Sequence, residues 1–110
     1  MVKLLTQDEL SAAAFMRLRE LSADMGWDDD WLEKQLYQEV AKPLGLGKAA
    51  VKMWFDRGIL PPAHIFNVAV VLGVDARWFS GQTDLTKADA IDETGLYFRE
   101  MERELRRSRP

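Results

Sequence analysis

The stretch from Val40 to Gly58, which reads VAKPLGLGKAAVKMWFDRG, decides the fold of this chain. Gly45 falls where the chain must reverse, because glycine can adopt the left-handed backbone conformation that ends a helix. From Leu46 onward the apolar residues recur at helical spacing, so the side chains of Leu46, Ala50, Val51 and Trp54 can share one buried face. Pro43 lacks an amide hydrogen, and we expect it to shorten or kink the helix before the turn. The stretch therefore predicts two short helices joined by a tight turn.

The second of these helices has a buried side and an outward side. The apolar set of the stretch is Val40, Ala41, Leu44, Leu46, Ala50, Val51 and Trp54. We assign Trp54 to the core because it continues the Val51 side of the helix. The residues left outside carry two lysines and are Gly47, Lys48, Ala49, Lys52 and Met53.

Helix signals also account for most of the remaining chain. Thr6 and Glu9 form a capping box that predicts a helix from Gln7 to Met25, stopped by Gly26. The acidic run 28–30 suits the start of a second helix, and we interpret it as a cap rather than a metal site. Further helices are predicted over 48–56, from Pro61–Pro62 to Leu72, and over 75–79, 86–93 and 96–107. The fold class is all-α.

The turn and the residues after it resemble the helix-turn-helix of the phage repressor and Cro family, the lambda-repressor-like domain. The resemblance covers roughly Gln35 to Gly81, and its further markers are Trp54, Arg57-Gly58, Leu60-Pro61-Pro62, Gly73-Val74, Trp78-Phe79 and Gly81. It implies a five-helix bundle whose third helix reads the major groove, usually as a dimer on a two-fold site. One departure is that Gly47 and Lys48 stand where the family usually has a hydroxyl or amide residue, so amide-to-adenine readout is missing there.

The resemblance assigns roles to the outward face. Base contacts are expected from Gly47, Lys48, Ala49, Lys52 and Met53, with the lysines donating to guanine and Ala49 and Met53 touching thymine methyl groups. Phosphate contacts are expected from Lys42 and Arg57. The chain has no cysteine and a single histidine, His64, so we expect no catalytic residue, no metal site, no cofactor and no small-molecule substrate. We do not expect an enzyme.

Charge is distributed unevenly along the chain. The 110 residues carry a formal net charge of −3 and a pI near 5.1, whereas a DNA-binding chain usually has a basic surface. Counted by segment, the net charge is −4 over residues 1–45, +2 over 46–83 and −1 over 84–110. The positive segment contains the lysine-bearing helix. The apolar runs are too short to span a bilayer, and we expect a cytoplasmic protein without a membrane partner.

We divide the chain into a helix-turn-helix DNA-binding domain, residues 1–82, and a C-terminal helical extension, residues 83–110. The extension carries an apolar seam of Leu96, Phe98, Met101 and Leu105, which either forms a homodimer interface or docks back on the domain. The function predicted is a sequence-specific transcriptional regulator on a pseudo-palindromic double-stranded DNA operator. The alternative is that the same fold serves as a protein–protein interaction module, such as a phage or mobile-element adaptor, without DNA binding.

Overall fold

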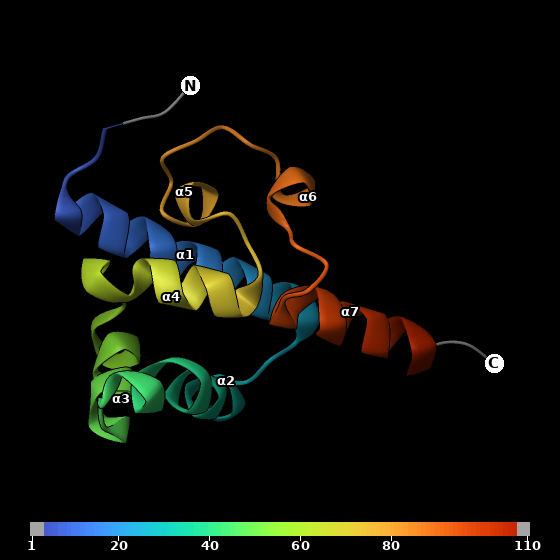
Figure 1. Ribbon diagram of the computed structural model, residues 1–110, viewed down its shortest axis with the longest axis horizontal. Coiled ribbons are helices and arrows are strands. Elements are labelled where there is room, and N and C mark those ends of the chain that lie inside the picture. Colours follow the sequence, from blue (N-terminus) through green and yellow to red (C-terminus); the bar gives the residue numbers. More distant parts are fainter. Residues whose placement is uncertain (1–3, 108–110) are drawn as a thin grey trace.

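The computed structural model describes residues 4–107, and every regular element within them is helical (Figure 1). The helices are α1 (Gln7–Met25), α2 (Asp29–Leu36), α3 (Lys48–Arg57), α4 (Pro62–Leu72), α5 (Ala76–Phe79), α6 (Lys87–Ala90) and α7 (Leu96–Arg107). A π-helical turn, η1 (Tyr37–Ala41), and a 3₁₀ turn, η2 (Lys42–Leu44), follow α2. The predicted all-α class is confirmed. None of the helices within residues 4–107 has the length and apolar character needed to cross a membrane.

The ends of α1 follow the signals in the sequence. The Glu9 amide donates to Thr6 Oγ1 at 3.2 Å, and the Thr6 amide donates to Glu9 Oε1 at 3.1 Å, which completes the capping box. Gly26 then ends the helix in the left-handed conformation, at φ 67°. Asp28 begins α2 by accepting a hydrogen bond from the Trp31 amide at 2.7 Å. The acidic run therefore includes a helix cap, as we expected.

Pro43 changes the path of the chain between α2 and α3. A regular α-helix would need an amide hydrogen at residue 43, and proline has none. The α-helix ends at Leu36, the chain widens into η1, and Pro43 lies in η2, whose first turn needs no donor from it. Gly45, at φ 76°, then reverses the chain, and the Leu46 amide donates to the Ala41 carbonyl at 2.9 Å. The interruption expected at Pro43 is thus a change of helix type over eight residues, 37–44.

The core lies where α1, α4 and α5 meet the segment from α2 to α3. We call this segment, residues 29–57, the helix-turn-helix. α1 and α4 lie side by side, and α2 and α3 lie below them in the view of Figure 1. Trp78 and Phe79 of α5 are buried, as are Leu18 and Leu21 of α1. Trp78 is therefore a core residue. Burial of these large side chains supplies most of the stabilisation that a helical domain of this size needs.

The C-terminal segment crosses the end of α4 at unusually close range. Gly73, at φ 77°, ends α4, and Gly95 lies directly against it. The Asp92 amide donates to the Gly73 carbonyl at 2.6 Å, and the Asp75 amide donates to the Ala90 carbonyl at 2.8 Å. This pairing makes a short antiparallel bridge, and it ends α6 at Ala90. The helix predicted over 86–93 is therefore wrong beyond Ala90, because the backbone groups that follow bond to residues after α4 instead.

A polar cluster ties α6 and α7 to the end of α1. Asp24 accepts hydrogen bonds from Lys87 Nζ at 2.6 Å and from the Tyr97 hydroxyl at 3.1 Å. The hydrogen bond to Asp24 raises the pKa of Lys87, and burial together with the same carboxylate raises the pKa of Tyr97. Trp27 packs edge-on against the Tyr97 ring, with 6.3 Å between ring centroids. The C-terminal segment is thus fixed to the rest of the chain.

Candidate nucleic-acid interface

The lysine-bearing side of α3 faces outward. Val51 and Trp54 are buried in the core, and Phe55 packs edge-on against Phe15 of α1. Trp54 is therefore a core residue, as the sequence predicted. The five residues expected to contact bases are all exposed: Gly47, Lys48, Ala49, Lys52 and Met53. The buried side fixes the rotation of α3 about its own axis, so this exposed side is fixed as well.

The start of α3 is open. Gly47 is its N-cap, with an extended backbone, and no side chain accepts a hydrogen bond from the first-turn amides. These amides point along the helix axis and carry a partial positive charge. Lys42 lies before the turn and Arg57 is the last residue of α3, and both are exposed. The ten residues of α3 span about 15 Å, so the two expected phosphate contacts flank the exposed face.

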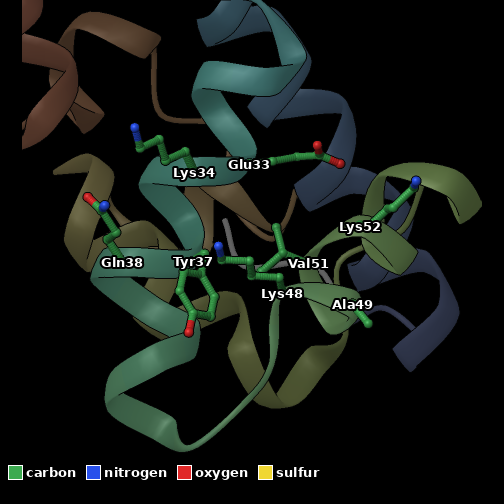
Figure 2. A pocket seen from close by; sticks show the side chains of 8 residues that line it. All are labelled: Glu33, Lys34, Tyr37, Gln38, Lys48, Ala49, Val51 and Lys52. Atoms are coloured by element: carbon green, nitrogen blue, oxygen red, sulfur yellow. The ribbon is translucent and has the colours of Figure 1, made fainter.

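A pocket of about 390 Å³ lies between α2 and α3 on this same face (Figure 2). Lys48, Ala49, Val51 and Lys52 line it from α3, and Glu33, Lys34, Tyr37 and Gln38 line it from the other side. The Lys48 ammonium lies 5.6 Å from the centre of the Tyr37 ring, within the range of a cation–π contact. The pocket joins the outward side of α2 to that of α3.

Four of these lining residues, Glu33, Lys34, Tyr37 and Gln38, were not among the predicted contacts. The sequence did contain a signal for them, because Leu32, Leu36 and Val40 occupy the buried side of the preceding helical segment. The positions between them must then face outward. What the sequence could not supply was the crossing of α2 and α3, which places the two outward sides around one hollow.

Within residues 4–107, most cations outside the helix-turn-helix form ion pairs, with Arg99 and Arg106 as exceptions, whereas the cations of the helix-turn-helix form none. Within residues 4–107, each ion pair takes its cation from α1, α5, α6 or α7, as in Arg17–Glu20, Lys87–Asp24 and Arg107–Glu104. No carboxylate of those residues lies within 4.0 Å of the cations of the helix-turn-helix, which are Lys34, Lys42, Lys48, Lys52 and Arg57. Glu33 is the one acidic residue lining the pocket. The cations of the helix-turn-helix thus remain available to an anionic partner.

The residues of the apolar seam that we expected to form a dimer differ in their exposure. Leu96 is only 8 % exposed and belongs to the core, and Met101 packs partly against that core. Phe98 is half-buried, whereas Leu105 is 58 % exposed near the free end of α7. The assignment of Leu96 to a dimer interface is therefore wrong. The crossing at Gly73 and Gly95 places the start of α7 against the core of its own protomer. For this residue the docking alternative holds.

His64 lies in the first turn of α4, against α3. Its ring centre is 5.4 Å from that of Trp54, and its Nδ1 is buried without a hydrogen-bond partner within the part of the chain that the structure describes. Across residues 4–107 there is no group of three or more histidine or acidic side chains placed to hold a metal ion. His64 thus serves as a packing residue behind α3.

Comparison of this chain with models of protein families, with curated proteins and with solved structures finds no significant match. The geometry of α2, α3 and their cations is therefore the basis for assigning a function.

Proposed function

We propose that this chain is a sequence-specific DNA-binding transcriptional regulator that inserts α3 into the major groove. The observation that carries the proposal is the group of exposed cations on the helix-turn-helix that have no ion-pair partner within residues 4–107, around helix α3, whose opposite side is anchored by Val51 and Trp54. The helix order also supports the proposal that the first five helices form a lambda-repressor-like bundle, to which α6 and α7 are added.

In this proposal the residues of α3 read bases and those around it set the position. Lys48 and Lys52 donate to guanine O6 and N7, while Ala49 and Met53 contact thymine methyl groups. Gly47 allows close approach of the backbone, and Lys42 and Arg57 contact phosphates. Occupancy of the operator then blocks or recruits polymerase.

The pocket between α2 and α3 adds contacts to this arrangement. Lys34 lies on the α2 side of the pocket, opposite Lys52, so it is suited to a phosphate at the edge of the same groove (Figure 2). Gln38 can both donate and accept hydrogen bonds. The Glu33 carboxylate repels a nearby phosphate. The total electrostatic attraction between this face and DNA is therefore moderate, and it falls with salt concentration. Binding of two copies to a two-fold operator would compensate for the moderate affinity of each copy.

Selection of bound sites from a randomised duplex library tests the proposal. A two-fold symmetric consensus is the expected result. On the selected duplex, Lys48→Ala and Lys52→Ala should each weaken binding by about 1–3 kcal/mol while leaving helicity and thermal melting unchanged. Arg106→Ala is the matched control, because Arg106 is an exposed cation on α7 without an ion-pair partner within residues 4–107. Equal binding by the parent and both lysine variants contradicts the proposed face.

A protein-binding module remains the second candidate. The pocket of about 390 Å³ favours it, since pockets of this size accept side chains or small ligands, and Val51, Ala49 and Tyr37 give it an apolar lining. A gel shift against random duplex over a range of salt separates the two candidates. An adaptor should produce no retarded band at any salt concentration.

A further inference from the structure

The longest uncharged part of the described chain is centred on α4. From Gly58 to Val74 there is no Asp, Glu, Lys or Arg, although 30 % of the whole sequence is charged. Within this segment Phe66 is 65 % exposed and Val70 is 58 % exposed. They are four residues apart, so they lie one above the other on one face of α4, with the exposed Pro62 one turn before them. We call Pro62, Phe66 and Val70 the α4 stripe.

A hollow adjoins this stripe. It has a volume of about 260 Å³ and is lined by Leu10, Pro62, Ile65, Phe66, Ala76, Ser80 and Gln82. Arg77 also lines it, but its guanidinium pairs with Asp75 at 3.4 Å. A large exposed aromatic side chain therefore lies directly beside a mainly apolar depression.

We infer that the α4 stripe is the surface on which a second copy of this chain docks, with Phe66 of each copy in the hollow of the other. An isologous dimer needs a surface that is complementary to itself, and a projecting ring next to a hollow satisfies that need under two-fold rotation. Two copies that each carry a net charge of −3 repel one another, and an uncharged face is where this repulsion is smallest. A charged partner, by contrast, would find no complementary charge on the stripe.

The size of the surface sets the strength of the dimer. The 11 residues of α4 span about 16 Å, and a stable interface usually buries about 800 Å² on each partner. The stripe and its hollow form a small interface, so the dimer is weak and reversible in the absence of DNA.

The position of α3 favours the α4 stripe over the free end of α7 as the dimer interface. α3 and the free end of α7 lie at opposite ends of the long axis, along which the molecule extends 47 Å (Figure 1). Two copies joined end to end at Leu105 would hold their α3 helices much farther apart than the 34–36 Å that separates adjacent half-sites. α4, however, starts four residues after Gly58, next to the end of α3. In this respect the inference rests on the proposed function.

Sedimentation equilibrium of the full chain without DNA tests the inference. At concentrations up to about 0.3 mM, where small interfaces associate, the parent should show a reversible monomer–dimer equilibrium. Phe66→Asp should raise the dimer dissociation constant at least about tenfold. Leu105→Asp is the matched control, since it places the same charge at another exposed apolar residue, and it should leave the equilibrium unchanged. Circular dichroism identifies a variant that fails to fold, in which case Val70→Asp replaces Phe66→Asp.

The outcomes separate the two proposals. A parent that stays monomeric at every concentration, or a dimer that Leu105→Asp breaks and Phe66→Asp does not, overturns the α4 interface. If that monomeric parent still selects a duplex sequence, the proposed function stands without this interface. If the parent dimerises through Phe66 but binds no duplex, the interface stands and the regulator proposal fails.

Discussion

Substitution of Gly95 by alanine should detach the C-terminal segment from α4. A Cβ at residue 95 would lie 2.1 Å from Gly73 Cα and 2.5 Å from the Leu72 carbonyl oxygen. Cβ atoms essentially never approach other heavy atoms more closely than 3.0 Å, and both neighbours here belong to the backbone. No side chain can rotate away to make room, so the two segments must move apart.

The cost of this movement follows from what the segment buries. Leu96 and Tyr97, the next two residues, are 8 % and 5 % exposed. Burial of a large apolar side chain is worth about 1.5–3 kcal/mol, and one hydrogen bond, such as that from the Asp92 amide to Gly73, contributes about 1 kcal/mol net. Alanine also restricts the unfolded chain, which opposes the loss by only about 0.4–1 kcal/mol. We therefore expect the free energy of unfolding to fall by about 3 kcal/mol or more.

Urea denaturation followed by tryptophan fluorescence measures this change. Gly47→Ser is the matched control, because a Cβ at Gly47 meets nothing within 4 Å and serine is a favourable N-cap. Its free energy of unfolding should change by no more than about 0.5 kcal/mol. A loss below about 1 kcal/mol for Gly95→Ala would show that the crossing yields easily and does not hold α7 in place.

Three further predictions concern charge, pH and chain length. If Lys34, Lys42 and Arg57 each meet a phosphate, the plot of log K against log salt has a slope of about −2.7 per protomer, and a Lys42→Ala, Arg57→Ala double variant reduces its magnitude by about 2 in fluorescence anisotropy titrations; an unchanged slope contradicts this. The pKa values of Tyr97 and Lys87 are both raised in the folded state, so the stability they contribute is complete below about pH 10 and is lost as pH rises through the folded pKa values. In urea midpoints measured from pH 8 upward, Tyr97→Phe should therefore lose stability less steeply than the parent, and parallel curves refute the assignment. A chain ending at Gln82 lacks the core residues Ala90, Leu96 and Tyr97, and its thermal midpoint should fall by at least about 10 °C; an unchanged midpoint means that residues 1–82 fold alone.

Local signals in the sequence predicted most helix ends correctly. The capping box at Thr6, the glycines at 26, 45, 58 and 73, and the proline before α4 each act on the backbone within a few residues. The buried side of α3 was predicted for the same reason, since one helical period relates Val51 to Trp54.

Features that depend on distant contacts were not predicted. The end of α6 is set by hydrogen bonds between residues 90–92 and residues 73–75, and no local pattern encodes that pairing. Leu96 looked like part of an outward seam because its spacing to Met101 and Leu105 is helical, but the crossing at Gly73 buries it. The hollow between α2 and α3 likewise depends on how two helices cross. Periodicity identifies which side of a helix is apolar, and tertiary contacts decide what covers that side.

The π-helical turn has a consequence for chain length. The Lys42 amide donates to the Tyr37 carbonyl, five residues back, so η1 accommodates one residue more than an α-helical turn would. Removing one residue from 37–41 can restore α-helical spacing without rotating the flanking segments against each other. We therefore expect homologous chains to tolerate a single-codon deletion here, in the middle of a helical segment, where deletions are ordinarily the most damaging.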